Sequence, residues 1–395
     1  MGACNDESTA GNLSMKKYNG NGLVDNKRRT LLKGAAALGV ATALGGLLPS
    51  KAWAKKKVGM GFIYVGPRDD YGYNQSHYEG KSSVAKLDWV KAVDQENVPE
   101  TIEVQKAMES MINLDGVQVL FPTSFGYFDP HILKVAPKYP DVMFLHCGGL
   151  WDASKHPKNV GSYFGYIDEA VYVAGIVAGH TSKTGKLGFI AAMPIPQVLR
   201  NINNFTLAAR SVNPKITTTV VFTGGWSLPV KEAEAANSLI DQGIDVLTCH
   251  VDSPKVVIET AEKRGIFSCG YHTNQAVLAP KGFLTGAQWN WSKVYQDYAE
   301  MISKGMKIPN LVRGGFKEGL VTSSPYGKAV GAKAKEQADK VRASFMNGSM
   351  VVYKGPIKDN TGRVVIAAGK EYKQTDVWLE SMDWLAEGVI GSTKG

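Results

Sequence analysis

Short apolar runs alternate with amphipathic stretches along the chain from Val58 onward. The first series has apolar runs at 58–65, 117–121 and 142–145 and helical patterns near 76–87, 101–113 and 130–138. The second has strand-like runs at 186–192, 218–223, 244–249 and 266–270 and helical patterns at 196–212, 230–242 and 254–264. Such alternation is typical of parallel βα units. Two series, each long enough to bury a sheet between helices, predict two doubly wound α/β lobes rather than one barrel.

The remaining elements predict how the two lobes are joined. An extended segment at 159–169 leads into a helix at 170–181 and is a candidate crossing. Further elements are an extended segment at 282–291, a helix at 292–305, a strand pair near 311–322 and a helix at 329–346. We expect lobe 1 at 55–168 plus about 280–320, lobe 2 at 169–279 plus about 321–355, and a tail at 356–395 packing on the lobes. Several crossings make a hinge, and a hinge between lobes predicts a cleft.

Composition narrows the class of protein. The chain has 395 residues, 44% hydrophobic and 21% charged, with only 4 Cys, which excludes a disulfide scaffold, a disordered chain and a polytopic membrane protein. Of the net charge of +9, residues 1–54 contribute +4, with seven basic and three acidic side chains, and the other +5 is spread over the remaining residues. The rest has no basic run, so a nucleic-acid partner is not indicated.

The N-terminal 54 residues resemble an export signal. A basic segment at 27–33 contains the pair Arg28-Arg29, an apolar Ala- and Gly-rich stretch follows at 34–48, and small residues lead to Ala54. The apolar stretch is shorter than the roughly 20 residues of a membrane span. Paired arginines indicate the twin-arginine route. We expect cleavage after Ala54 and a periplasmic protein; the alternative is an amphipathic anchor or an uncleaved span.

Three cysteines remain after that cleavage, Cys147, Cys249 and Cys269, an odd number. Each follows an apolar run, which favours buried structural thiols over a metal site. A Cys249–Cys269 bridge stays open at this point. Histidines lie nearby, but no spacing specifies zinc, and we expect neither a metal nor a cofactor.

The unusual residues follow the predicted strands, where ligand sites form in parallel sheets. Aromatic and uncharged hydrogen-bonding residues dominate the loops at 66–77, 122–130, 193–197, 224–227, 250–254 and 270–274. Aromatic side chains at strand ends provide stacking surfaces for a planar ligand, and the polar groups fit a neutral heterocycle. The alternative for Tyr73, Phe125 and Trp226 is that each fastens its loop to its own lobe.

Enzyme signatures are incomplete. His77-Tyr78-Glu79 matches half of a zinc-deaminase signature, but no Pro-Cys-x-x-Cys follows. Gly59-Met60-Gly61 lacks the third glycine of a dinucleotide loop, and there is neither a phosphate-binding P-loop nor a Gly-x-Ser-x-Gly elbow. We therefore expect a binding protein and not an enzyme.

Five segments, 72–80, 123–127, 194–198, 226–232 and 250–254, resemble the basic membrane protein family, the solute-binding proteins of ABC importers that include purine nucleoside receptors. The likeness covers about 57–392. It implies a type I periplasmic-binding fold with three interlobe strands, a purine-type ligand between two aromatic rings, and an ABC permease in the inner membrane as partner.

The resemblance also implies roles for residues. Tyr73 matches the stacking aromatic of the first lobe, Trp226 that of the second, and Asn74 the polar partner of the first ring. Nucleoside-binding members usually hold ribose with an Asp and a Lys. Here His272 or Asn274 and Trp289 take those places, which weakens the case for ribose recognition.

The sequence is similar to the free-base branch of the family, which has His at the position of His77 and the Pro-Ile-Pro motif at 194–196. We therefore expect a monomeric receptor for a purine base or related heterocycle. The alternatives are a nucleoside receptor, an amino-acid or sugar receptor, a periplasmic nucleoside hydrolase and a ligand-sensing module. The candidate ligand contacts are Tyr73, Asn74, His77, Ser124, Phe125, Trp226, Asp252, His272, Asn274 and Trp289.

Overall fold

The computed structural model describes residues 57–149 and 151–394. The predicted leader and its cleavage position lie outside these residues. Within them, no helix combines the length and the apolar character that a membrane crossing requires.

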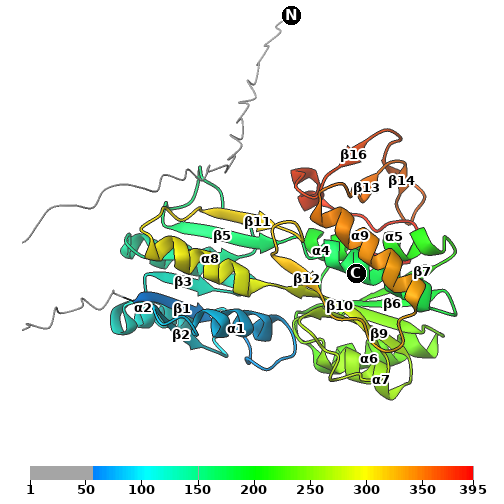
Figure 1. Cartoon of the computed structure of the whole chain (residues 1–395), viewed down its shortest axis with the longest axis horizontal. Coiled ribbons are helices and arrows are strands. Elements are labelled where there is room, and N and C mark those ends of the chain that lie inside the picture. Colours follow the sequence, from blue (N-terminus) through cyan, green and yellow to red (C-terminus); the bar gives the residue numbers. More distant parts are fainter. Residues whose placement is uncertain (1–56, 150, 395) are drawn as a thin grey trace, which may run out of the picture. The chain divides into compact units, whose positions relative to one another are not determined.

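The first sheet has six strands, all parallel, in the order β11-β5-β4-β3-β1-β2 (Figure 1). Its strands are β1 (Val58–Ile63), β2 (Val90–Gln95), β3 (Val119–Pro122), β4 (Met143–Cys147), β5 (Val160–Gly165) and β11 (Leu311–Gly314). Helices cover both faces of the sheet, and the side chains of each strand point alternately to one face and to the other. The Phe62 ring lies 4.8 Å from that of Tyr295, whereas Ile63 belongs to the cluster around Val104. This alternation packs helices on both sides.

Helices α1 (Tyr73–Val84) and α8 (Trp291–Ser303) pack together on the Phe62 face. The Ile63 face carries α2 (Ile102–Asp115) and a run of short turns, η1 (Phe125–Tyr127), η2 (Phe128–Ile132), α3 (Leu133–Val135) and η3 (Ala136–Lys138). The helix expected at 130–138 is therefore broken into short turns. We call this sheet and its helices lobe 1.

The second sheet has the order β12-β10-β9-β8-β6-β7-β17, parallel except for the β10–β12 pair. Its strands are β6 (Lys186–Ala191), β7 (Thr217–Phe222), β8 (Val246–His250), β9 (Phe267–His272), β10 (Phe283–Trp289), β12 (Val321–Ser323) and β17 (Val389–Ile390). Its helices are α4 (Asp168–Thr181), α5 (Pro196–Val212), α6 (Pro229–Asp241), α7 (Lys255–Lys263) and α9 (Ala332–Met346). We call this unit lobe 2. The two-sheet α/β architecture confirms the predicted fold class.

Four strands, β2, β10, β11 and β12, depart from the sequence prediction. The segment 283–289, expected with lobe 1, is β10 of the second sheet, because it pairs with β9 along its length. The strand pair expected near 311–322 is wrong, since β11 joins the first sheet and β12 the second. β2 was not predicted, because this edge strand is only half-buried and has no apolar run. Between β5 and α4, β10 and α8, and β11 and β12, the chain crosses between the lobes.

The three described cysteines, Cys147, Cys249 and Cys269, are buried free thiols. The Cys249–Cys269 bridge left open by the sequence is therefore not formed. Burial raises the pKa of the Cys147 and Cys269 thiols to about 12, which keeps both protonated and unreactive at neutral pH.

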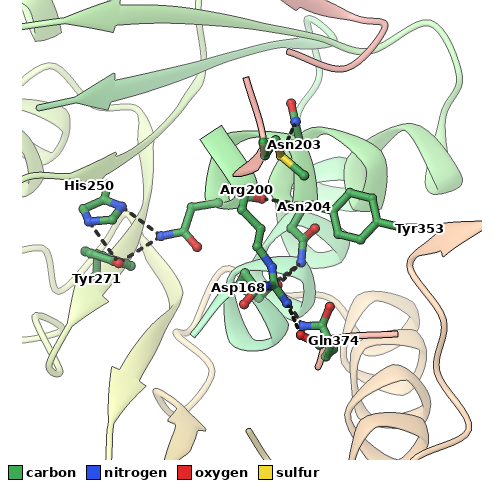
Figure 2. A network of polar contacts seen from close by, with 10 residues as sticks. Asp168, Arg200, Asn203, Asn204, His250, Tyr271, Tyr353 and Gln374 are labelled. Carbon is green, nitrogen blue, oxygen red and sulfur yellow. Dashed lines mark hydrogen bonds and ion pairs between the residues drawn. The ribbon is translucent and has the colours of Figure 1, made fainter. Parts of the chain in front are cut away.

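The C-terminal segment, red in Figure 1, lies beside α9 and α5. It contains the short strands β13 (Tyr353–Lys354), β14 (Ile357–Lys358), β15 (Val364–Ile366) and β16 (Glu371–Tyr372) and the turn η4 (Val377–Ser381). Figure 2 shows the buried polar network that fixes it to lobe 2. Asp168 Oδ2 accepts hydrogen bonds from Arg200 Nε (2.9 Å), Asn204 Nδ2 (2.9 Å) and Gln374 Nε2 (2.7 Å). Arg200 also donates to the Gln374 carbonyl at 2.9 Å, so one ion pair joins α4, α5 and the tail.

Replacing Asp168 by Ala leaves the Arg200 guanidinium buried without its counter-charge. We expect the free energy of unfolding in a denaturant titration to fall by about 3 kcal/mol or more. The control is Asp297→Ala, which removes one partner of the exposed Lys293–Asp297 pair and is expected to cost less than about 0.5 kcal/mol. Equal, small losses in both variants would contradict the structural role of this network.

Candidate functional site

A narrow cavity lies between the two lobes, where the carboxyl ends of several strands meet. The centre of a water molecule can occupy about 50 Å³ of it, and the surrounding space free of protein atoms, which is partly open to solvent, is about 530 Å³. Its walls are formed by Tyr73, Ser124, Phe125, Cys147, Gly148, Phe164, Ile195, Gln197, Trp226, His250, Asp252, His272 and Trp289. Asp252 is the single Asp, Glu, Lys or Arg in this set, and five of the residues are Phe, Tyr or Trp.

Tyr73 is held from behind by a stack of rings in lobe 1. It is the first residue of α1, and its hydroxyl donates to the Thr123 carbonyl at 2.6 Å. The His77 ring, one helical turn later, meets the Tyr73 ring edge-on at 4.7 Å. His77 in turn stacks on Trp291 at 5.1 Å with an interplanar angle of 2°, and its Nδ1 bonds the Tyr295 hydroxyl at 2.6 Å. The Tyr73 ring is therefore positioned before any ligand arrives.

Trp226 reaches the cavity from a glycine-containing turn after β7. Gly224 has φ +84°, a left-handed conformation that favours glycine. The Trp226 carbonyl accepts a hydrogen bond from the Asp252 backbone N–H at 2.6 Å, and its ring lies 6.0 Å from that of His250. These contacts place the ring of lobe 2 on the same cavity as Tyr73.

His272 and Trp289 form one fixed wall. Trp289 Nε1–H donates to His272 Nδ1 at 2.8 Å, so the His272 proton is on Nε2, which donates to the Val251 carbonyl at 3.1 Å. Burial lowers the pKa of His272 well below its ordinary value, which keeps the ring neutral. His272 has φ 74°, which costs backbone energy and is sustained by these two bonds. Both nitrogens are used, so His272 offers a ligand a surface rather than a hydrogen bond.

Both ring nitrogens of His250 are likewise engaged in hydrogen bonds within the protein. Its Nδ1 accepts from Asn201 Nδ2 at 2.9 Å, and its Nε2 lies 3.3 Å from the Tyr271 hydroxyl, to which Asn201 also donates (Figure 2). Burial lowers the His250 pKa to about 3. Two neutral, fully bonded imidazoles therefore line the cavity.

Two wall residues keep free polar groups. Among the described residues, neither the Asp252 carboxyl nor the Gln197 amide has a hydrogen-bond partner. Burial raises the pKa of Asp252 well above its ordinary value, and the carboxyls of Asp70, Glu100 and Glu232 add to the effect. Ser124 is less free, because its hydroxyl donates to Glu100 Oε1 at 2.5 Å.

The structure brings seven of the ten predicted residues to the cavity: Tyr73, Ser124, Phe125, Trp226, Asp252, His272 and Trp289. Three are not in its walls. Asn74 points to the loop before α1, where its amide donates to Asp70 Oδ2 at 2.8 Å and accepts from the Gly66 N–H. His77 lies behind Tyr73, and exposed Asn274 bonds the Ala276 N–H.

Sequence reasoning missed six wall residues, Cys147, Gly148, Phe164, Ile195, Gln197 and His250. Ile195, Gln197 and His250 belong to loops that the sequence did single out, so their place after a strand was an available signal. Phe164 lies in the crossing strand β5, where nothing in the sequence distinguishes a cavity residue from a core residue. No cluster of His, Cys, Asp and Glu suited to a metal ion occurs in the described part of the chain.

Direct hydrogen bonds close the lobes over the cavity. The Tyr73 N–H donates to the Asp252 carbonyl at 2.8 Å, and Ser253 Oγ donates to the Asp70 carbonyl at 2.8 Å. Gln275 Nε2 donates to the Tyr71 carbonyl at 2.7 Å. Each bond joins the loop and helix start at 70–73 in lobe 1 to lobe 2, so this is a closed conformation.

Gly72 permits that approach. A Cβ atom at this position would lie 1.9 Å from the Asp252 carbonyl oxygen and 2.6 Å from Pro254 Cδ, far inside any real contact distance. The residue before the stacking tyrosine must therefore lack a side chain if the lobes are to meet as they do.

Two α/β lobes joined by three crossings, with a cavity between the carboxyl ends of their strands, define a type I solute-binding protein of the periplasmic class. The model of the PnrA-like ABC transporter substrate-binding proteins matches residues 57–372, and the chain belongs to that family. The predicted resemblance is thereby confirmed.

Relatives and solved structures agree with this placement. The chain is 35% identical over 352 residues to a purine-binding protein of Brucella abortus, covering 89% of this chain and 98% of the relative. It is 31% identical to a putative ABC transporter glucose-binding protein of Haloferax volcanii, covering 85% and 81%. A solute-binding protein structure from Conexibacter woesei has TM-score 0.62 at 21% identity, covering 74% of this chain and 97% of the other, and shows the shared fold.

Substituting Gly72 by Ala is expected to keep the lobes apart, because the new methyl group overlaps the Asp252 carbonyl. The measurement is small-angle X-ray scattering, in which the variant should have a larger radius of gyration than the unaltered protein. Gly331→Ala is the matched control, since that glycine has φ −70° and no atom within 4 Å of its Cβ position. Superimposable curves for all three proteins would show that the 72–252 contact does not set the closed state.

Proposed function

We propose that this protein captures a purine base, or a related uncharged heterocycle, for import through an ABC permease. The observation that carries the proposal is a narrow interlobe cavity with Tyr73 on one lobe and Trp226 on the other. A flat ring stacked between two aromatic side chains gains on the order of 1 kcal/mol per face beyond area burial. The Brucella relative, described as purine-binding, supports the same class of ligand.

The charges of the cavity favour a neutral ligand. An amino acid would need a cation for its carboxylate, and no Lys or Arg is among the cavity walls. A sugar would need several free hydrogen-bonding groups, whereas His250 and His272 are already saturated. The remaining free groups, on Asp252 and Gln197, are enough to hold one edge of a heterocycle.

A purine nucleoside is the second candidate, because a further cavity adjoins the first. It has a volume of about 360 Å³ and shares Phe125, Gly148, Phe164, Ile195, Gln197 and Trp226 with the first cavity. Its charged residues are already paired, Arg200 with Asp168 and Arg313 with Glu380. Because the charged residues that line this second cavity are all paired in the described structure, it offers a ribose diol no free charged group, and the base is the better fit.

We further propose that the protein works outside the cytoplasmic membrane. Substrate-binding proteins of ABC importers deliver their ligand to the permease from that side. The basic pair Arg28-Arg29 and the apolar stretch after it support export by the twin-arginine route with removal of residues 1–54.

Isothermal titration calorimetry with adenine, guanine, hypoxanthine, urate, the matching nucleosides, glucose and glycine tests the proposed ligand class. We expect at least one free purine to bind with a dissociation constant of about 1 μM or tighter, corresponding to about −8 kcal/mol. The nucleosides should bind more weakly than their bases. Tight nucleoside binding without base binding would transfer the proposal to the second candidate, and binding of glucose or glycine alone would reject both.

Trp226→Ala removes one of the two stacking faces. We expect the dissociation constant of the tightest-binding purine to rise tenfold or more, a loss of at least about 1.4 kcal/mol. Trp89→Ala is the control, because Trp89 lines a different hollow on lobe 1. Unchanged affinity in the Trp226 variant would remove this residue from the ligand site.

A further inference from the structure

Asp252 occupies a fixed place between the two ring-bearing residues. Its backbone N–H donates to the Trp226 carbonyl at 2.6 Å, and its own carbonyl accepts from the Tyr73 N–H at 2.8 Å. Asp252 therefore joins the backbone of Tyr73 to that of Trp226, and it lines the cavity that the rings of these two residues border. A ligand stacked between the rings would present an edge to this carboxyl group.

Among the residues that the structure describes, no cation pairs with the Asp252 carboxyl. Lys231 and Lys255 follow on the adjoining helices, but Lys231 Nζ donates to the Thr223 carbonyl at 3.4 Å and Lys255 Nζ lies 5.5 Å over the Tyr71 ring. The two arginines nearest the cavity, Arg200 and Arg313, are held by other carboxylates.

The other groups around Asp252 are acids or neutral. Asp70 before α1, Glu100 before α2 and Glu232 on α6 are carboxyls that disfavour a further negative charge. His250 on β8 and His272 on β9 are neutral, and Tyr73 and Cys147 keep their protons because burial raises the pKa of each. A negative charge on Asp252 would thus be compensated by none of its neighbours.

We propose that Asp252 determines ligand specificity by binding the heterocycle as a neutral carboxylic acid, whose O–H donates to a ring nitrogen while its C=O accepts from an adjacent amino group. The carboxylic acid and the edge of the heterocycle are then joined by two adjacent hydrogen bonds. Adenine presents this arrangement, a ring nitrogen acceptor beside an amino donor. The inference rests on the proposed purine-binding function and adds which edge is read and in which protonation state.

An ionised Asp252 would select differently. A carboxylate only accepts hydrogen bonds, so it would repel the ring nitrogen of adenine and favour the two adjacent N–H donors of guanine. Burial and the neighbouring acids raise the Asp252 pKa, which favours the neutral acid in the empty cavity. Adenine binding is then complete below that raised pKa and is lost as pH rises through it.

The test is equilibrium dialysis of radiolabelled adenine and guanine against the mature protein from about pH 6 to about pH 9, where adenine itself stays neutral. In the unaltered protein, the dissociation constant of adenine should rise with pH, approaching about tenfold per unit once Asp252 ionises. The preference for adenine over guanine should fall over the same range.

Two variants distinguish the contribution of the Asp252 proton from the contribution of the Asp252 side chain as a whole. Asp252→Asn carries a permanent donor beside an acceptor and should bind adenine within about threefold of the unaltered protein at about pH 6, with no loss at higher pH. Asp252→Ala lacks both hydrogen bonds and should bind about tenfold or more weakly at every pH.

The failures are distinguishable. If the unaltered protein binds neither adenine nor guanine at any pH, and no other purine in calorimetry, the proposed function fails. If adenine binds but Asp252→Asn is as weak as Asp252→Ala, or if adenine binds more tightly as pH rises, purine binding stands and the neutral-acid assignment is overturned. An affinity that stays constant while Asp252→Asn matches the unaltered protein means that Asp252 keeps its proton over the whole range. Circular dichroism of both variants checks that each is folded.

Discussion

The hydrogen bond from the Tyr73 N–H to the Asp252 carbonyl is the constraint on which the cavity depends. It is possible only because Gly72 has no side chain. It lies between Tyr73 of lobe 1 and the loop of lobe 2 that also holds the Trp226 backbone, and both rings border one cavity. A hydrogen bond of this kind contributes only about 1 kcal/mol net, and joining two lobes costs conformational entropy. Closure is therefore finely balanced, and a ligand that makes contacts only in the closed state can shift the population strongly.

The residues that line the cavity are of two kinds: some only provide a contact surface, and others have polar groups that are free to bind a ligand. His250 and His272 have every ring nitrogen engaged within the protein, so they fix geometry and exclude charge. The layered rings of His77 and Trp291 do the same for Tyr73. Because these groups are ordered beforehand, little side-chain entropy remains to be lost on binding. On the proposed function, selectivity falls to the polar groups that have no partner among the described residues, above all the Asp252 carboxyl, whose protonation would control which edge of the ligand is recognised.

How far the sequence predicts this arrangement depends on the range of the interactions. The periodicity at 196–212 predicts α5 with its observed bounds, because helix patterns are local. The direction of Asn74 and His77 is not predictable from their place beside Tyr73, since one is drawn to Asp70 and the other lies a helical turn behind the ring. The Trp289–His272 bond is not predictable from strand alternation, because the β9–β10 register pairs His272 with Gln288 and the left-handed backbone of His272 turns its ring toward Trp289. A single sequence gives alternation along each strand but not the register between two strands.

Closure is also unequal at the two ends of the interlobe space. Around Gly72 the lobes meet through bonds to three backbone carbonyls, which are short, partly buried and insensitive to salt. At the adjoining cavity, the link between the first sheet and the tail is the ion pair of Arg313 on β11 with Glu380 in η4, and the Glu380 side chain is 36% exposed. Exposed ion pairs stabilise by only about 0–1 kcal/mol and are screened by salt. The contact at the second end therefore stabilises closure less, and in a more salt-dependent way, than the bonds around Gly72.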